Sequence, residues 1–475
     1  MQVVTCGFGF QEISPLNYDV IIVGAGPAGI FSALELADKT DLNILMLDKG
    51  PDINQRKCPA SRGFECIHCE PCLLLSGWGG AGSFSDGKLT LSTEVGGWLN
   101  QYVSTEELGK LISYVDSIYI KFGATKHVYG TDIKKVEEIE RKASLTGLKL
   151  IRQKIRHMGT ERCAQTLRRM RQELNGNVEV KLKKDVRGLI VKNNVVEGVE
   201  TVNGEKFFGK YVIVAPGRSG AEWLQAEAQA LGLKTLNNPV DVGIRVEVLA
   251  SVMEELTSAL YEPKFVYYSK FFDDQVRTFC VAPYGEVITE SYNGVLSVNG
   301  QSYAERKTKN TNFAILVSTS FTAPFKEPIA YGKYLARLST LLSGGVMIQR
   351  LGDLQSGRRS TPERIDRSVV TPTLKNATPG DLSFVLPYRY LVDIREMLQA
   401  LDKITPGIHS TDTLLYGIEV KFYSSRLKLS NSLETKIHNL FTIGDGAGVT
   451  RGLVQASASG VIVAKGIIKR ERQKP

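Results

Sequence analysis

The first residues that could do chemistry form a glycine-rich turn that is followed, further along the chain, by an acid. Gly24-Ala25-Gly26-Pro27-Ala28-Gly29 follows the short apolar run 20–23 and opens a helical pattern, after which a second apolar run ends on Asp48. In a strand–turn–helix unit such glycines permit a sharp turn, the approach of a pyrophosphate to the backbone and close packing of helix on strand. The helix N-terminus presents unpaired N–H groups to phosphates, and the acid accepts hydrogen bonds from a ribose. The sequence therefore predicts a dinucleotide site.

Four cysteines are clustered directly after this unit. Cys58, Cys66, Cys69 and Cys72 fall within fifteen positions, with His68 among them. Two overlapping C-x2-C spacings and an upstream cysteine could supply four thiolates to zinc or to an iron–sulfur cluster. The alternatives are a thiol/disulfide pair that exchanges electrons with the cofactor, and a set of reduced structural cysteines.

A second glycine-rich stretch, SGWGGAGSFSDGKL, follows the cysteines. Residues 77–82 match GxGxxG, but no amphipathic helix follows, and residues 82–88 resemble a phosphate loop with Leu89 where a magnesium-binding hydroxyl is needed. We therefore interpret the stretch as a loop whose backbone N–H groups touch a cofactor ring or phosphate. Its candidate contacts are Gly80, Gly82 and Ser83, and its other polar members are Ser85, Asp86 and Lys88.

The remaining chain predicts a sheet edge and a long middle segment. Residues 178–215 read as a meander of short strands that returns to a central strand and ends before Gly217, and residues 439–445 read as a strand that ends in Gly444-Asp445. Ligands of open α/β sheets sit at such carboxyl edges. The segment from about 225 to 410 reads as an antiparallel sheet without a nucleotide motif, which makes it the expected substrate-binding part.

The composition is that of an ordinary soluble protein. The chain has 475 residues, of which 43% are apolar and 23% charged, enough for two or three domains. No apolar run reaches the length of a membrane span and residues 1–17 lack a signal-peptide pattern, so we expect a cytoplasmic protein without a transmembrane segment. The net charge of +9 is spread along the chain, and we expect no nucleic-acid partner.

Three separated pieces resemble known FAD signatures. GAGPAG with Asp48, YVIVAPG and NLFTIGDGAG are similar to the FAD motifs of glutathione-reductase-like flavoproteins, in the subgroup containing fumarate reductases and geranylgeranyl reductases. More narrowly, SGWGGAGSFSDGKL, RTFCVAPYGEV, YGIEVKFYS and GDGAGVTRGLVQASASG resemble a poorly characterised family of bacterial and archaeal FAD-dependent dehydrogenases, over nearly the full length.

This resemblance implies an α/β fold in which a Rossmann-like FAD-binding domain carries an inserted, mostly antiparallel α+β substrate domain. The implied division is 1–100 for the first part of the FAD-binding domain with the cysteine-rich loop 58–72, 101–174 for a helical insertion, 175–224 for the second FAD-binding part, 225–410 for the substrate domain and 411–475 for the third FAD-binding part.

The resemblance also assigns roles to residues. Gly24, Gly26 and Gly29 would receive the FAD pyrophosphate, and Asp48 the adenosine ribose. The backbone of Val186 would meet the adenine. The further candidate contacts are Pro27 and Ala28 in the first turn, Lys49 after the acid, Gly80, Gly82 and Ser83 in the loop that would cover the flavin ring, Gly217 at a strand end, Asp445 at the ribityl chain or pyrophosphate, and Gly444, Gly448 and Val449 before the helix whose N-terminus would face the ring.

The expected function is that of an FAD-dependent oxidoreductase acting on a small or lipid-like organic substrate. Because the chain lacks a second complete GxGxxG unit, electrons would come from the substrate, from transiently bound NAD(P)H or from a redox protein partner. Lys421 and Tyr423, near Glu419, are candidate catalytic acids or bases, with ordinary strand residues as the alternative. Cys280 reads as a core residue. The alternative functions are saturation of polyprenyl double bonds and a flavin-binding sensor or partner without catalysis.

Overall fold

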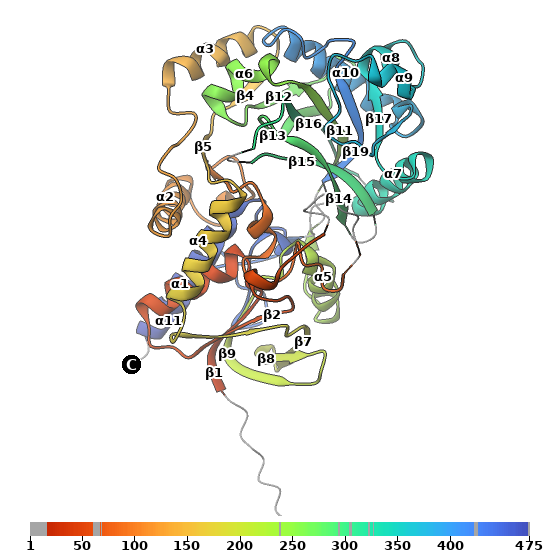
Figure 1. The fold of residues 1–475 in the computed structure, drawn as a ribbon. Coiled ribbons are helices and arrows are strands. Elements are labelled where there is room, and N and C mark those ends of the chain that lie inside the picture. The colour runs from red at the N-terminus through yellow and green to blue at the C-terminus, as the bar shows by residue number, and fades with distance from the viewer. Residues whose placement is uncertain are drawn as a thin grey trace, which may run out of the picture.

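The chain folds around two large sheets, which lie one above the other in Figure 1. The computed structural model describes residues 17–59, 67, 69–236, 239–292, 295–303, 306–321, 324–325, 327–421 and 426–473. The helices of this part of the chain are α1 (Pro27–Lys39), α2 (Thr105–Lys121), α3 (Ile133–Ser144), α4 (Thr160–Glu173), α5 (Ala221–Ala230), α6 (Ala250–Leu260), α7 (Pro328–Ser343), α8 (Leu351–Gln355), α9 (Pro362–Asp366), α10 (Tyr388–Asp402) and α11 (Leu453–Arg472).

The first sheet carries the glycine turn. In the described residues it has seven strands, in the order β6-β2-β1-β9-β8-β7, with β21 paired to the second half of β9. They are β1 (Asn17–Val23), β2 (Ile44–Asp48), β6 (Val178–Leu182), β7 (Val186–Lys192), β8 (Val195–Thr201), β9 (Lys206–Val214) and β21 (Leu440–Thr442). Val23 lies opposite Leu47 and Val214, and Thr442 is also opposite Val214, so four parallel strands end at one edge.

The α/β architecture predicted from the sequence is confirmed by this sheet. The runs 20–23 and 44–47 are buried on both faces, as parallel strands between helices require. The meander is formed by β7, β8 and β9, whereas β6 pairs in parallel with β2 at the opposite edge. The small-residue helix α11 packs against α1, where a Cβ on Gly460 would lie 2.2 Å from the Ala28 carbonyl oxygen.

The second sheet is almost entirely antiparallel. Its order in the described residues is β18-β17-β19-β11-β16-β13-β12-β4, and only β17 and β18 pair in parallel. Its strands are β4 (Lys149–Ile151), β11 (Val240–Leu249), β12 (Lys264–Tyr268), β13 (Gln275–Ala282), β16 (Asn310–Thr319), β17 (Met347–Arg350), β18 (Thr378–Pro379) and β19 (Leu414–Lys421).

The two faces of the second sheet differ in chemistry. Alternate residues of β11, from Val240 to Val248, join α6, α7 and α10 in an apolar core. The other face carries Asp241, Arg245 and Glu247, and it is buried rather than solvated. It packs under the hairpin of β14 (Glu286–Tyr292) and β15 (Val295–Gln301), which lies between the two sheets in Figure 1.

Two segments depart from the division that the sequence implied. The insertion 101–174 is not only helical, because β4 pairs with β12 at the edge of the second sheet and β5 (Lys154–His157) pairs with β3 (Lys88–Leu91). β19 lies in the middle of the second sheet, although residues 411–421 were assigned to the third FAD-binding part. The chain then returns to the first sheet through the short pair β10 (Thr235–Leu236) and β20 (Arg426–Leu427).

None of the described helices is long and apolar enough to cross a lipid bilayer.

Candidate functional site

The three glycines of the first turn are required for different reasons. A Cβ on Gly24, where φ is +108°, would lie 2.0 Å from the Ala215 carbonyl oxygen, and a Cβ on Gly29 would lie 2.0 Å from the Gly24 carbonyl oxygen. These two glycines are therefore needed by the fold itself. At Gly26 the nearest atom to such a Cβ is 4.0 Å away, in Gly80. The protein alone does not require glycine there, and the free space suits a ligand that approaches the backbone.

Two helix N-termini converge on this turn. α1 begins at Pro27 after Gly26, and α11 begins at Leu453 after Gly452; neither helix has a side-chain cap among the described residues or an acid in its first turn. A Cβ on Gly82 would touch both Leu453, at 2.8 Å, and Pro27, at 3.4 Å. Uncapped N–H groups and aligned peptide dipoles favour bound anions, so this corner is a suitable place for a pyrophosphate.

Asp48 ties the turn to its surroundings. Its carboxylate accepts backbone hydrogen bonds from Ala25 at 2.9 Å and from Gly50 and Gly77 at 2.8 Å each. A carboxylate offers about four lone-pair positions, which leaves room for a ribose hydroxyl. The Lys184 N–H donates to the Asp48 carbonyl oxygen at 2.9 Å, so the start of β7 at Val186 runs beside the end of β2. The predicted ribose contact, Asp48, and the predicted adenine contact, Val186, thus lie close together. Lys49, which follows Asp48, is half-buried.

The second glycine loop docks directly on the first. The Gly79 N–H donates to the Ala25 carbonyl oxygen at 2.7 Å, and a Cβ on Gly80 would lie 3.1 Å from the Gly26 Cα. The buried Arg56 side chain supports the loop by donating to the Trp78 carbonyl oxygen at 2.7 Å and to the Ser83 hydroxyl at 2.8 Å. Burial lowers the pKa of Arg56 to about 10, which leaves it charged at neutral pH. Sequence reasoning missed Arg56, because nothing local marks it as a loop support.

The carboxyl ends of β9 and β21 complete the edge. A Cβ on Gly446 would lie 2.2 Å from the Gly217 carbonyl oxygen, so the two strand ends are in contact. The Asp445 carboxylate accepts a hydrogen bond from the Thr450 hydroxyl at 2.7 Å, which fixes the turn that leads into α11. The remaining predicted contacts in this turn are Gly444 and Gly448, both with positive φ, and the buried Val449.

Three glycines leave the backbone open along this edge. A Cβ added to Gly217 or to Gly452 would meet no atom within 4 Å, and Gly26 is nearly as open. These three glycines come from the ends of three segments that are distant in sequence. Together with the buried Ala28 below the turn, the residues present fit an extended phosphate-bearing cofactor.

The predicted cysteine centre is only partly described. Cys66 and His68 lie outside the described residues. Burial raises the pKa of the Cys72 thiol, and the nearby Cys69 and Cys58 thiols raise it further. No group of three or more His, Cys, Asp or Glu side chains placed to hold a metal is found in the described part of the chain. A metal at these cysteines stays a prediction.

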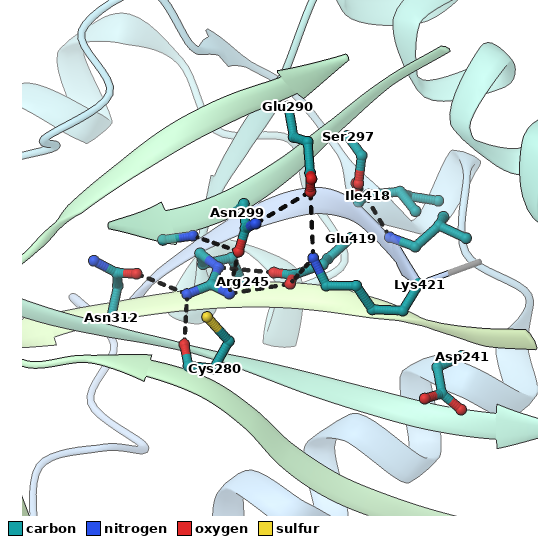
Figure 2. Close-up of polar contacts among 12 residues, drawn as sticks. Asp241, Arg245, Cys280, Glu290, Ser297, Asn299, Asn312, Ile418, Glu419 and Lys421 are labelled. Atoms are coloured by element: carbon teal, nitrogen blue, oxygen red, sulfur yellow. Dashed lines mark hydrogen bonds and ion pairs between the residues drawn. The ribbon is translucent and has the colours of Figure 1, made fainter. Parts of the chain in front are cut away.

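A network of buried charges covers the polar face of the second sheet (Figure 2). Arg245 and Glu419 are both fully buried and form a double hydrogen bond, with Nε–Oε2 at 2.7 Å and Nη2–Oε1 at 3.0 Å. Arg245 also donates to the Asn312 side-chain oxygen at 2.8 Å and to the Cys280 carbonyl oxygen at 3.0 Å. The strands β13, β16 and β19 thus each supply a partner for this guanidinium, as a buried charge requires.

Lys421, a candidate catalytic residue, belongs to this network. Its ammonium lies 3.0 Å from Glu419 and 3.5 Å from Glu290. Although burial opposes the charged form, these two carboxylates raise the pKa of Lys421. A lysine held in its protonated form acts as a cation rather than as a general base. The second candidate, Tyr423, lies outside the described residues.

Comparisons with known proteins agree with an FAD-dependent protein. The family model described as "FAD-dependent protein, C-terminal domain-like" matches residues 240–422, which run from the first residue of β11 to just past β19. The matched residues contain every strand of the second sheet except β4. An uncharacterized protein of Clostridium beijerinckii is 28% identical over 95% of this chain and 80% of its own length.

Solved structures with a similar arrangement are distant. A mutant quinol fumarate reductase of E. coli is 13% identical, with a TM-score of 0.42 over 96% of this chain and 71% of that one. The L-proline dehydrogenase of P. horikoshii is 13% identical, with a TM-score of 0.40 over 96% of this chain and 94% of that one. Because both TM-scores are below 0.5, the fold assignment rests on the strand order and glycine contacts described above.

Proposed function

We propose that this chain is an FAD-dependent oxidoreductase that exchanges two electrons with an organic substrate bound between the two sheets. The observation that carries the proposal is the convergence of the α1 and α11 N-termini on three glycines with free space around them. The match of residues 240–422 to an FAD-dependent family supports the choice of FAD over other dinucleotides. The resemblance to bacterial and archaeal FAD-dependent dehydrogenases belongs to the same proposal.

On this proposal, residues of the first sheet's carboxyl edge would each hold one portion of the cofactor. When bound, FAD supplies the two-electron chemistry that protein side chains lack. Gly26 and the two helix N-termini would hold the pyrophosphate, Asp48 and the start of β7 would hold the adenosine, and Asp445 would hold the chain between pyrophosphate and ring. The amides after Gly448 would lie near the ring, where the α11 dipole would favour negative charge by about 1 kcal/mol.

The polar face of the second sheet helps to decide whether the substrate is polar or apolar. Saturation of polyprenyl double bonds needs a long apolar tunnel beside the cofactor. The face of the second sheet that packs under the β14–β15 hairpin instead carries Arg245, Glu419 and Lys421 in its buried layer. A substrate bound next to this charged layer would be polar rather than a polyprenyl chain.

The test begins with protein purified without oxygen. We expect a flavin absorption spectrum and release of FAD, identified by mass, on denaturation. The bound flavin should lose its visible absorbance with dithionite and regain it with at least one member of a panel of organic acceptors. It should also respond to NADH, NADPH, reduced ferredoxin or an organic donor.

Two results would contradict the proposal. Folded protein that is colourless and does not take up added FAD would show that the chain does not bind this cofactor. A bound flavin that responds to dithionite but to no donor or acceptor in the panel would favour the sensor function, in which the flavin turns over slowly.

A further inference from the structure

A buried lysine on the polar face of the second sheet has no ion pair with any other described residue. Lys264 is the first residue of β12 and is 7% exposed. Phe265 and Tyr267 of the same strand join the apolar core, so Lys264 points to the opposite, polar face. Among the described residues its ammonium has no hydrogen bond and no carboxylate within ion-pair distance, and it lies 5.2 Å from the centre of the Phe279 ring.

The charged groups near this lysine already have partners. Glu262 forms an ion pair with Lys88 at 2.6 Å, and the Lys88 ammonium also contacts Asp86 at 3.3 Å. Arg277, whose guanidinium carbon lies 5.3 Å from the centre of the Phe279 ring, pairs with Asp241. Glu262, the carboxylate that acts on Lys264, is therefore held by another cation.

An unpaired buried ammonium is unfavourable unless something else supplies a counter-charge. Burial lowers the pKa of Lys264 to about 8, and the positive charges of Arg277 and Lys88 add to this effect. The group still carries its charge for most of the time at pH 7. A ligand anion beside it would gain both the ion pair and the hydrogen bonds that the protein leaves unmade.

Lys264 lies close to partly exposed side chains and, through Lys88, to the loop that docks on Gly26. Phe279 and Cys280 are half-buried, so the cluster borders the protein surface. The Lys88 ammonium lies 3.1 Å from the Val281 carbonyl oxygen and 3.7 Å from the Cys280 sulfur. Lys88 begins β3, a few residues after the loop that docks on Gly26. We call Lys88, Glu262, Lys264, Phe279 and Cys280 the Lys264 cluster.

We propose that the Lys264 cluster binds a carboxylate group of the substrate, with the adjoining carbons packed on the Phe279 ring. One free ammonium matches one negative charge. The nearby carboxylates of Glu262 and Asp86 would repel a phosphate dianion more strongly than a singly charged carboxylate. The inference deepens the proposed function, because it names an organic acid as the substrate class, but binding of the acid does not itself require FAD.

The test measures binding of benzoate, benzamide and inorganic phosphate by thermal denaturation of the apoprotein and of the FAD-loaded protein. We expect benzoate to raise the midpoint saturably and benzamide, its uncharged analogue, not to do so. Lys264→Met should weaken benzoate binding at least tenfold and leave FAD affinity within twofold. Lys264→Arg should keep part of the benzoate affinity. Lys110→Met, at an exposed lysine paired with Glu106, is the matched control and should change neither affinity.

The outcomes separate this inference from the proposed function. Equal benzoate binding by wild type and Lys264→Met, or binding of phosphate in preference to benzoate, would overturn the carboxylate site. So would a wild type that benzoate does not stabilise. If the protein takes no FAD yet Lys264→Met still removes the benzoate effect from the apoprotein, the carboxylate site stands and the proposed function fails.

Discussion

Replacing Gly26 by alanine is expected to leave the apoprotein nearly as stable as the wild type and to weaken FAD binding. The new methyl group would have no neighbour closer than 4.0 Å. Gly26 is the N-cap of α1, where alanine is less favourable than glycine by about 0.5–1 kcal/mol. In the holoprotein the same methyl group would occupy the space through which the pyrophosphate reaches the backbone.

Gly24→Ala and Gly29→Ala should behave in the opposite way. Each new methyl group would lie 2.0 Å from a backbone carbonyl oxygen, which cannot rotate away. Overpacking of this kind costs about 1–3 kcal/mol, and the positive φ of Gly24 adds strain of about 1–3 kcal/mol. Both variants should therefore destabilise the apoprotein, Gly24→Ala the more strongly.

The assay is urea unfolding of the apoprotein with and without FAD. At a free FAD concentration of 100 times Kd the wild type gains about 2.7 kcal/mol. With tenfold weaker binding, Gly26→Ala gains only about 1.4 kcal/mol at the same concentration. Gly345→Ala is the control, because a Cβ there meets no atom within 4 Å. The reasoning is refuted if Gly26→Ala destabilises the apoprotein as much as Gly24→Ala does, or if it keeps the full gain from FAD.

Three further predictions concern the buried charges and the cysteines. Arg245→Met should lower the free energy of unfolding in urea by about 3–5 kcal/mol, because the buried Glu419 carboxylate loses its main partner. Lys333→Met, the control at a surface ion pair, should change the free energy of unfolding by less than about 1 kcal/mol. Similar changes in the two variants would contradict the role of the buried pair. Burial lowers the pKa of His157 from 6.5 to about 4, so its neutral form contributes stability above pH 6.5 that is lost as the pH falls toward 4, about 2 kcal/mol by pH 5. His157→Phe should lack this loss when unfolding is compared at pH 7.5 and pH 5, and an unchanged loss would assign it to other groups. In metal analysis, wild-type protein purified without oxygen should contain bound metal, and the double variant Cys58→Ser, Cys72→Ser should not. A wild type that holds no metal and has titratable thiols would contradict the metal site and leave the thiol/disulfide pair and the reduced structural cysteines as the alternatives.

The sequence allowed the cofactor edge to be predicted because the features that form it are local. Gly29 is set by a contact within the turn, with the Gly24 carbonyl oxygen, and the apolar runs before Gly24 and Asp48 have the length and burial of parallel strands. The contact of Gly24 with the Ala215 carbonyl oxygen joins segments that are far apart in sequence, and the local pattern does not show it. The contacts of these positions with FAD stay predictions.

The second sheet could be predicted only in part. The alternation in β11 indicated a strand with one apolar face, and the usual expectation for Asp241 and Arg245 on the other face is solvent. That face is buried because Arg245 meets Glu419, 174 residues further along the chain. Such a pair leaves no trace in the local pattern, and for the same reason β19 was assigned to the neighbouring segment. Lys264 was missed likewise, since only the fold shows that its neighbours are already paired.

The late position of β21 in the sequence affects the order in which the first sheet can be completed during synthesis. Its three residues complete the edge of the first sheet beside β9, and α11 then packs against α1, although both elements come after residue 439. A nascent chain in which β21 and α11 have not yet left the ribosome lacks one of the two helix N-termini that converge on the first glycine turn. If FAD binds here as proposed, its capture has to follow the synthesis of α11, and removal of residues 440–473 should yield protein that does not retain the nucleotide.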